Sequence, residues 1–99
     1  MAQILLTGIA TLDIINHVET YPQEDDEVRA LDQELRRGGN AANTASILQQ
    51  LGHHCRLACT LADDLSGQFI HDDICSRGIH YDPALIIEHA SSPTSYITL

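Results

Sequence analysis

The segment Arg36-Arg37-Gly38-Gly39-Asn40-Ala41-Ala42-Asn43 joins two glycines to the start of a predicted helix. Gly38 and Gly39 have no Cβ atom, so the backbone here can turn sharply and lie close to a bound molecule. The first amides of a helix have no partner within the helix and point outward. The segment therefore predicts a junction between a loop and a helix at which backbone donors are exposed.

Two asparagines stand on the first turn of this helix. Asn40 and Asn43 are three residues apart, so their side chains share one face. Each carboxamide can both donate and accept hydrogen bonds, and paired amides beside free backbone donors suit a small ligand rich in hydroxyl groups. The hypothesis is a sugar-like ligand. The alternative is that Asn40 only caps the helix, a role that asparagine fills well, and this segment alone does not separate the two.

Length and charge restrict the possible partners. The 99 residues allow one small domain, and a hydrophobic content of 43% permits a core. A protein that binds nucleic acid or an anionic membrane normally has a basic surface, whereas the net charge here is −9. No apolar run approaches the ~18 residues of a membrane span, and the N-terminus has no signal-peptide pattern. We expect neither partner, and a cytoplasmic location.

Cysteine and histidine give no metal-site pattern. Cys55, Cys59 and Cys75 are odd in number and lack the spacing of metal ligands, so they are predicted to be free, buried thiols. The six histidines form no zincin-type pair, and no metal site is expected. The neighbouring Arg36 and Arg37 are predicted to be solvated rather than to bind an anion.

The N-terminal residues predict two kinds of strand. Residues 4–10 are almost continuously apolar, which is typical of a strand buried on both faces and, at this position, of the central strand of an α/β fold. Residues 11–18 and 28–36 read as extended segments that could pair as a small side sheet. Asp13 lies just past the first strand, where α/β sheets bind ligands. Its carboxylate could accept hydrogen bonds from two hydroxyls, or it could be a solvated turn residue.

The remainder alternates between helix and strand. Residues 40–51 have helical periodicity in Ala41, Ala45 and Leu48, and Gly52 is suited to end the helix. Residues 55–61 predict a second strand of the main sheet. A second helix should start at Asp63 or Ser66 and stop at Gly78, and residues 84–88 and 95–99 should form a strand pair.

Taken together, these features resemble the N-terminal part of a carbohydrate kinase of the ribokinase or PfkB family. The matching positions are Gly8 with Asp13, residues 38–43, Leu51-Gly52, and Asp64 with Gly67. The pair Tyr21-Pro22 followed by acids, then Arg29, Leu31 and Arg37, is most similar to the ketohexokinase branch. Cys59 and Ala62 stand where many relatives carry glycines.

The resemblance implies an α/β fold: a ribokinase-like (Rossmann-like) sandwich with a small β-sheet lid, incomplete in this chain. Core segments are expected at approximately 3–11 and 38–79, and lid segments at approximately 12–37 and 80–99. Similar proteins contact the sugar through residues that match Asp13, Gly39, Asn40 and Asn43. In ketohexokinase-like relatives the lids of two subunits clasp, which implies a homodimer.

The implied activity is ATP-dependent transfer of the γ-phosphoryl group to a sugar hydroxyl, with Mg²⁺. The family's catalytic Asp lies in a Gly-Ala-Gly-Asp motif that these 99 residues do not contain. No catalytic residue is therefore assigned here, and the residues that bind ATP and Mg²⁺ are expected downstream of this chain. Since phosphoryl transfer needs nucleotide, metal and base around the acceptor, the 99 residues alone are expected to be inactive.

Other functions stay open at this point. Fructokinase, ribokinase and nucleoside kinase differ in acceptor while keeping similar site residues. A non-catalytic module that dimerises through the lid is the alternative from another class, whereas a dinucleotide-binding domain is disfavoured because no Gly-x-Gly-x-x-Gly follows the first strand. We also expect low stability or self-association, because elements that would cover the first strand are absent from these residues.

Overall fold

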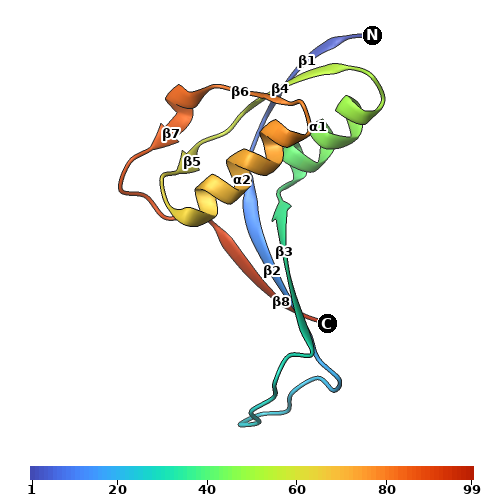
Figure 1. The fold of residues 1–99 in the computed structure, drawn as a ribbon, viewed down its shortest axis with the longest axis vertical. Coiled ribbons are helices and arrows are strands. Elements are labelled where there is room, and N and C mark those ends of the chain that lie inside the picture. Colours follow the sequence, from blue (N-terminus) through green and yellow to red (C-terminus); the bar gives the residue numbers. More distant parts are fainter.

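The computed structural model describes residues Met1–Leu99, which form two three-stranded sheets and one short two-stranded sheet (Figure 1). One of the three-stranded sheets carries both helices. In the helix-covered sheet, β1 (Gln3–Thr7) pairs in parallel with β4 (His54–Ala58), and β4 pairs in parallel with β6 (His80–Tyr81). Within these residues the strand order β1-β4-β6 places β1 at an edge of the sheet, so the central position expected for the first strand is not seen among them. β4 is central because both neighbours pair with it.

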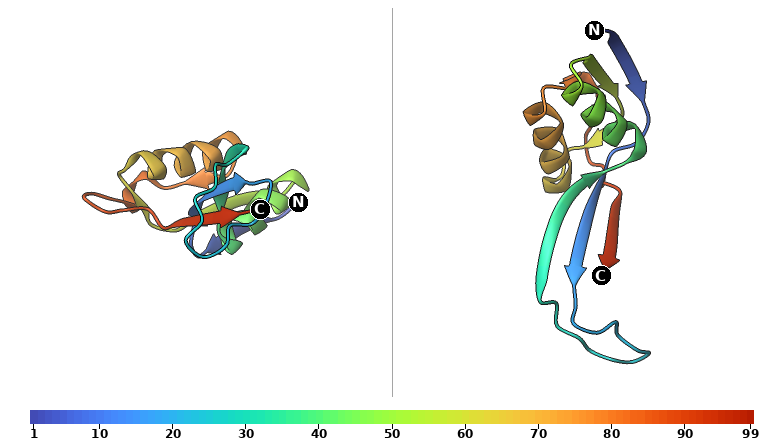
Figure 2. Two further views of the ribbon diagram at one scale, coloured as in Figure 1. Left: turned by 90° about the horizontal axis from the view of Figure 1, so that it is seen from below. Right: turned by 90° about the vertical axis from the view of Figure 1, so that its right-hand side faces the viewer.

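Both helices lie on the same side of this sheet (Figure 2). Ile4 and Leu6 therefore pack against the core, while Leu5 points away and is 66% exposed. Burial of the first strand on both faces, as predicted from its apolar sequence, does not occur within these residues, because no helix here covers the other side.

The two helices begin and end close to the predicted positions. α1 (Asn40–Gln50) is followed by Gly52 at φ 95°, and α2 (Leu65–Ser76) is followed by Gly78 at φ 80°. The N-cap of α2 is Asp64, whose carboxylate accepts a hydrogen bond from the Gly67 amide at 2.7 Å. It is neither of the two predicted caps, Asp63 and Ser66.

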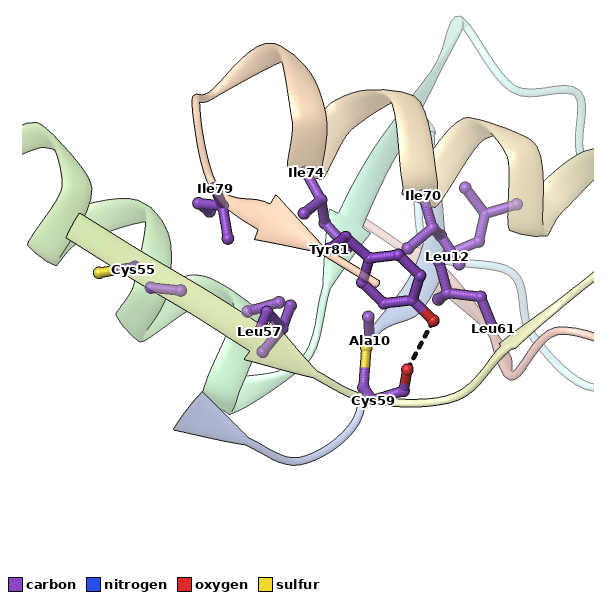
Figure 3. Close-up of a cluster of buried hydrophobic side chains, with 12 residues drawn as sticks. Ala10, Leu12, Cys55, Leu57, Cys59, Leu61, Ile70, Ile74, Ile79 and Tyr81 are labelled. Carbon is purple, nitrogen blue, oxygen red and sulfur yellow. Dashed lines mark hydrogen bonds between the residues drawn. The ribbon is translucent and has the colours of Figure 1, made fainter. Parts of the chain in front are cut away.

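A single buried cluster lies between the helices and the sheet (Figure 3). Its members are Ala10, Leu12, Ala42, Ala45, Cys55, Leu57, Cys59, Leu61, Ile70, Ile74, Ile79 and Tyr81. The hydroxyl of Tyr81 donates to the Cys59 carbonyl at 2.6 Å, and burial raises the pKa of Tyr81 to about 12. All three cysteines are free, but only Cys55 and Cys59 are buried; Cys75 is exposed, contrary to the prediction.

The second sheet has the strand order β3-β2-β8 and extends away from the helices (Figure 1). β2 (Thr11–His17) pairs antiparallel with β3 (Asp32–Gly38), which confirms the predicted side sheet, although β3 starts later than residue 28. β8 (Thr94–Thr98) runs parallel to β2 on its other edge. Leu12 belongs to the buried cluster, so the base of this sheet is anchored in the core.

The predicted strand pair near the C-terminus is wrong. After the 3-10 helix η1 (Pro83–Leu85), β7 (Ile86–Ile87) pairs with β5 (Leu61–Ala62), and β8 pairs with β2. Both partners are distant in sequence, which local alternation cannot reveal. The division into core and lid segments stays a prediction, although β6, inside the expected lid range 80–99, pairs with the core strand β4.

The chain is elongated. Its extents are 50 × 33 × 18 Å, and its radius of gyration of 15.7 Å exceeds the about 13 Å of a compact domain of this length. The accessible surface of 6764 Å² is likewise larger than the ~5,600 Å² expected for this mass. None of the helices has the length and apolar character that crossing a membrane requires.

Candidate functional site

The candidate site lies at the sheet junction, where Gly8–Ala10 leads from β1 into β2 and Gly38–Gly39 leads from β3 into α1. Strand register pairs Thr11 with Gly38 and Asp13 with Arg36. Because α1 starts two residues after Gly38, its first turn follows directly on the residue that pairs with the base of β2. The predicted residues Asp13, Gly39 and Asn40 all lie around this junction.

Asp13 belongs to β2 itself rather than to a loop after the first strand. Its carboxylate accepts a hydrogen bond from the Thr11 hydroxyl at 3.2 Å and is partly exposed. A Cβ atom on Gly38 would lie 2.5 Å from Asp13 Oδ2 and 2.6 Å from Thr11 Oγ1. The missing side chain at Gly38 therefore leaves the space in which this carboxylate sits.

Gly39 makes the turn into the helix. It has a φ of 101°, a conformation that residues with a side chain rarely adopt. A Cβ atom there would lie 2.1 Å from the carbonyl oxygen of Ile9. Since both the conformation and the space exclude a side chain, the helix can begin directly against the Gly8–Ala10 connection.

The first turn of α1 has free donors. Gly39 is the N-cap and no side chain caps the helix, so the alternative role for Asn40 as a cap is not adopted. The first helical backbone bond runs from the Asn43 amide to the Gly39 carbonyl at 2.9 Å. The three amides before it have no intrahelical partner, and the Asn40 side chain is exposed beside them.

Asn43 is exposed and contacts Arg37, not Asp13. The Arg37 Nη1 group donates to Asn43 Oδ1 at 2.6 Å. Along β3, Arg37 stands opposite Leu12 whereas Arg36 stands opposite Asp13, and neighbouring side chains of a strand point to opposite faces. The structure therefore turns the Asn43 oxygen toward the Arg37 side, and no hydrogen bond joins Asp13 to either asparagine.

Arg37 is buried, which corrects the prediction of a solvated side chain. Its side chain is 4% exposed and forms an ion pair with Asp73 of α2, with an Nε to Oδ2 distance of 2.8 Å. Burial alone would raise the pKa of Asp73, but hydrogen bonds and charge from Arg77 and Arg37 lower it below its ordinary value. The neighbouring Arg36 matches the prediction, since it is 65% exposed and pairs with Glu34.

Asp64 has a role that the sequence did not predict. Besides capping α2, its carboxylate accepts from the Ser92 amide at 2.8 Å and the Ser92 hydroxyl at 2.6 Å. These bonds from Ser92, together with the Gly67 amide, lower the pKa of Asp64. The carboxylate thus ties the segment before β8 to the helix-covered half. The sequence signal for this role was the presence of Asp64 together with Gly67. The structure shows why position 67 is glycine: a Cβ atom there would lie 1.9 Å from the Ala62 carbonyl oxygen.

No group of three or more histidine, cysteine, aspartate or glutamate side chains is arranged to hold a metal ion. The chemistry available at the junction is hydrogen bonding: one carboxylate that accepts, and amides that donate. Such a set suits a neutral ligand with several hydroxyl groups.

Comparison with known proteins gives a match over the whole chain. The family described as pfkB family carbohydrate kinase matches residues 1–99. Ketohexokinase from Mus musculus is 38% identical over 93 residues, which cover 94% of this chain and 31% of that protein. The chain therefore spans about a third of the length of this relative.

Solved structures agree on the fold. A carbohydrate kinase from Agrobacterium tumefaciens superposes with a TM-score of 0.86 at 22% identity, over 100% of this chain and 32% of that one. A ribokinase from Cryptococcus neoformans var. grubii serotype A, solved in complex with ADP, gives a TM-score of 0.77 at 20% identity, over 99% and 30% of the two chains. At these identities the likeness shows the ribokinase-like fold alone.

Proposed function

The chain belongs to the pfkB family of carbohydrate kinases, and we propose that it forms the sugar-binding part of an ATP-dependent kinase that phosphorylates a sugar hydroxyl. One observation carries the proposal: the Asp13 carboxylate fills the space left by Gly38, beside a helix that starts with free amides. A carboxylate beside the glycines that lead into a helix with several free N–H donors can hold a polyol together with those donors.

Each proposed residue has a separate task. Asp13 would accept hydrogen bonds from two sugar hydroxyls, because a carboxylate has four lone-pair sites and Thr11 uses one. Gly39 would let the sugar approach the backbone, and the side-chain amides of Asn40 and Asn43 would donate to sugar oxygens. These polar groups would form hydrogen bonds with the sugar hydroxyls. A ligand that lacks a matching hydroxyl would leave one of them unpaired and would bind more weakly, which is the basis of specificity in such sites.

Phosphoryl transfer needs groups that these residues do not supply. We propose ATP as the phosphoryl donor and Mg²⁺ as the ion that neutralises its charge, because this division of labour is general in such transfers. The 99 residues contain no Gly-Ala-Gly-Asp sequence, so we assign them no catalytic base. Accordingly, the 99-residue chain by itself should show no sugar-dependent ATP turnover.

The acceptor is proposed to be a ketohexose such as fructose, on the strength of the 38% identity to ketohexokinase. Ribose or a nucleoside is the alternative. The test is a coupled ADP-release assay on the natural protein that contains these residues, with fructose, ribose and adenosine as acceptors. Turnover with fructose above the other two is expected; turnover with none of them would refute the kinase proposal.

We further propose a homodimer formed through the β3-β2-β8 sheet in the cytoplasm. Opposite Ile14, the strand register places Leu35 on one side and Tyr96 on the other, which are 50% and 76% exposed. An exposed apolar row of this kind on a sheet is suited to pack against the same row of a second copy of the chain. Light scattering of the natural protein should give the mass of a dimer. A dimer without turnover would favour the non-catalytic module instead.

A further inference from the structure

We propose that Arg37 is a positioning residue: it holds the side-chain amide of Asn43 so that Nδ2 is presented to the sugar as a hydrogen-bond donor. The inference rests on the proposed function, because it concerns how that site is built. It adds a residue that does not touch the sugar.

Arg37 reaches three groups with three of its nitrogens. Nη1 donates to Asn43 Oδ1 at 2.6 Å, Nη2 to Ser46 Oγ at 2.7 Å, and Nε to Asp73 Oδ2 at 2.8 Å. Asn43 and Ser46 stand three residues apart on one face of α1. The guanidinium therefore lies across the first two turns of the helix whose start forms the proposed site.

The chemistry of the two groups fixes the orientation of the amide. A guanidinium has N–H donors and no acceptor. Only the oxygen of the Asn43 carboxamide can face it, so Nδ2 must point elsewhere. Without Arg37, the exposed carboxamide could rotate and offer either atom to a ligand. Arg37 thus decides that Asn43 donates rather than accepts.

The guanidinium is itself anchored. Arg37 is 4% exposed, and the Asp73 carboxylate that pairs with it also receives Arg77 Nε at 2.9 Å. A buried charge persists only when it is paired and hydrogen-bonded. Because Asp73 belongs to α2, the orientation of Asn43 depends on the packing of α2 against β3.

Arg77 provides a matched control for Arg37. Both arginines donate through Nε to Asp73 Oδ2, but only Arg37 contacts Asn43. Removing Arg77 therefore removes the same kind of charge and the same kind of bond to Asp73, while leaving the Asn43 contact in place.

The experiment is isothermal titration of fructose into the natural protein that contains these residues, with melting curves for each variant. The variants are Arg37→Met, Asn43→Ala, the double variant and Arg77→Met. We expect Arg37→Met and Asn43→Ala each to raise the Kd for fructose about tenfold, the loss typical of one good hydrogen bond. The double variant should bind no more weakly than Asn43→Ala alone, and Arg77→Met should stay within about twofold of the unsubstituted protein.

A purely structural role would give a different pattern. Arg37→Met would then weaken binding by the same factor whether or not Asn43 is present, and Arg77→Met would weaken it in step with its loss of melting temperature. Either result would overturn the inference. If the unsubstituted protein binds neither fructose nor ribose, the proposed function fails and the role of Arg37 fails with it; an additive cycle in a protein that does bind fructose refutes the role of Arg37 alone.

Asn43→Asp keeps the experiment decisive if Arg37→Met does not fold. The new carboxylate can still accept from Arg37, so the melting temperature should be preserved, but no donor faces the sugar. We expect at least a tenfold rise in the Kd for fructose. An unchanged Kd would overturn the inference.

Discussion

The two three-stranded sheets of this chain are stabilised in different ways. In the β1-β4-β6 half, helices α1 and α2 bury a continuous apolar cluster, and Ile70 and Ile74 are completely inaccessible. In the β3-β2-β8 half, Ile15 is the one buried side chain beyond the base of the sheet, and most other residues are half-buried or exposed. The first half depends on burial, and the second depends on strand register and on the connections that tie it to the first.

Those connections contain the polar residues of the site. Gly38 and Gly39 connect β3 to α1, and the Asp64–Ser92 bonds hold the segment before β8. The Arg37–Asp73 pair fastens the end of β3 to α2. The difference between the halves teaches that the proposed site residues belong to neither half alone. They are placed by the junction, so a change there should affect sugar binding and stability together.

The largest expected effect breaks the helix-covered half. Ile70→Ala should lower the free energy of unfolding by about 2–5 kcal/mol, because it leaves a cavity in a fully buried cluster. Urea unfolding followed by circular dichroism measures this loss. The control is Ile47→Ala on α1, where the side chain is 58% exposed and the same deletion should cost little. Equal losses would contradict the account of the core.

The next effect breaks the connection between the halves. Gly39→Ala combines the strain of a backbone conformation that essentially only glycine adopts, about 1–3 kcal/mol, with a collision against the Ile9 carbonyl. Gly52→Ala carries only the strain, because its φ is 95° but no atom lies within 4 Å of the added Cβ. The melting temperature of Gly39→Ala should therefore lie well below that of Gly52→Ala. A similar melting temperature for both would show that the close approach at Gly39 is unimportant.

A smaller effect is expected from the Asp64–Ser92 hydrogen bonds, which hold the segment before β8 and should make stability depend on pH. The pKa values of Asp64 and Asp73 are lowered in the folded chain, so their contribution is complete above the unfolded pKa of about 4 and is lost as the pH falls through the lower folded values. Asn is also a good N-cap, so Asp64→Asn should keep α2 while removing part of this acid sensitivity. Melting temperatures from pH 6 to pH 2 give the comparison, and parallel profiles for the two proteins would contradict it.

The smallest effect on stability is expected in the exposed sheet. Leu35→Ser should change the free energy of unfolding by less than about 0.5 kcal/mol, because the side chain is half exposed. It should nevertheless shift the mass in solution toward the monomer, since Leu35 belongs to the proposed dimer surface. Sedimentation velocity measures this shift. An unchanged dimer would place the contact elsewhere, and a large loss of stability would mean that this sheet is not held mainly by register.

Much of the fold follows from local patterns in the sequence. Periodicity and glycine positions predicted α1 and its end at Gly52, and the extended character of residues 11–18 and 28–36 predicted the β2–β3 pair. The features that local patterns missed depend on distant partners. β7 and β8 pair with strands far away in the sequence rather than with each other.

The site was predicted in part for the same reason. Residue types and spacing identified Asp13, Gly39, Asn40 and Asn43 as candidates, and the first three lie around the sheet junction. The burial of Arg37 could not be predicted, because its partner Asp73 lies 36 residues further along the chain. The orientation of Asn43 was missed with it, since that orientation is set by Arg37.

The most direct test of the sugar site is the affinity of the natural protein for fructose when Asp13 is replaced by alanine. The matched control is Asp32→Ala, in the same sheet, where the exposed carboxylate only accepts from the next backbone amide. We predict that Asp13→Ala raises the Kd measured by titration calorimetry at least about tenfold, while Asp32→Ala leaves it unchanged. An unchanged Kd in the Asp13→Ala variant would contradict the assignment of the sheet junction as the sugar site.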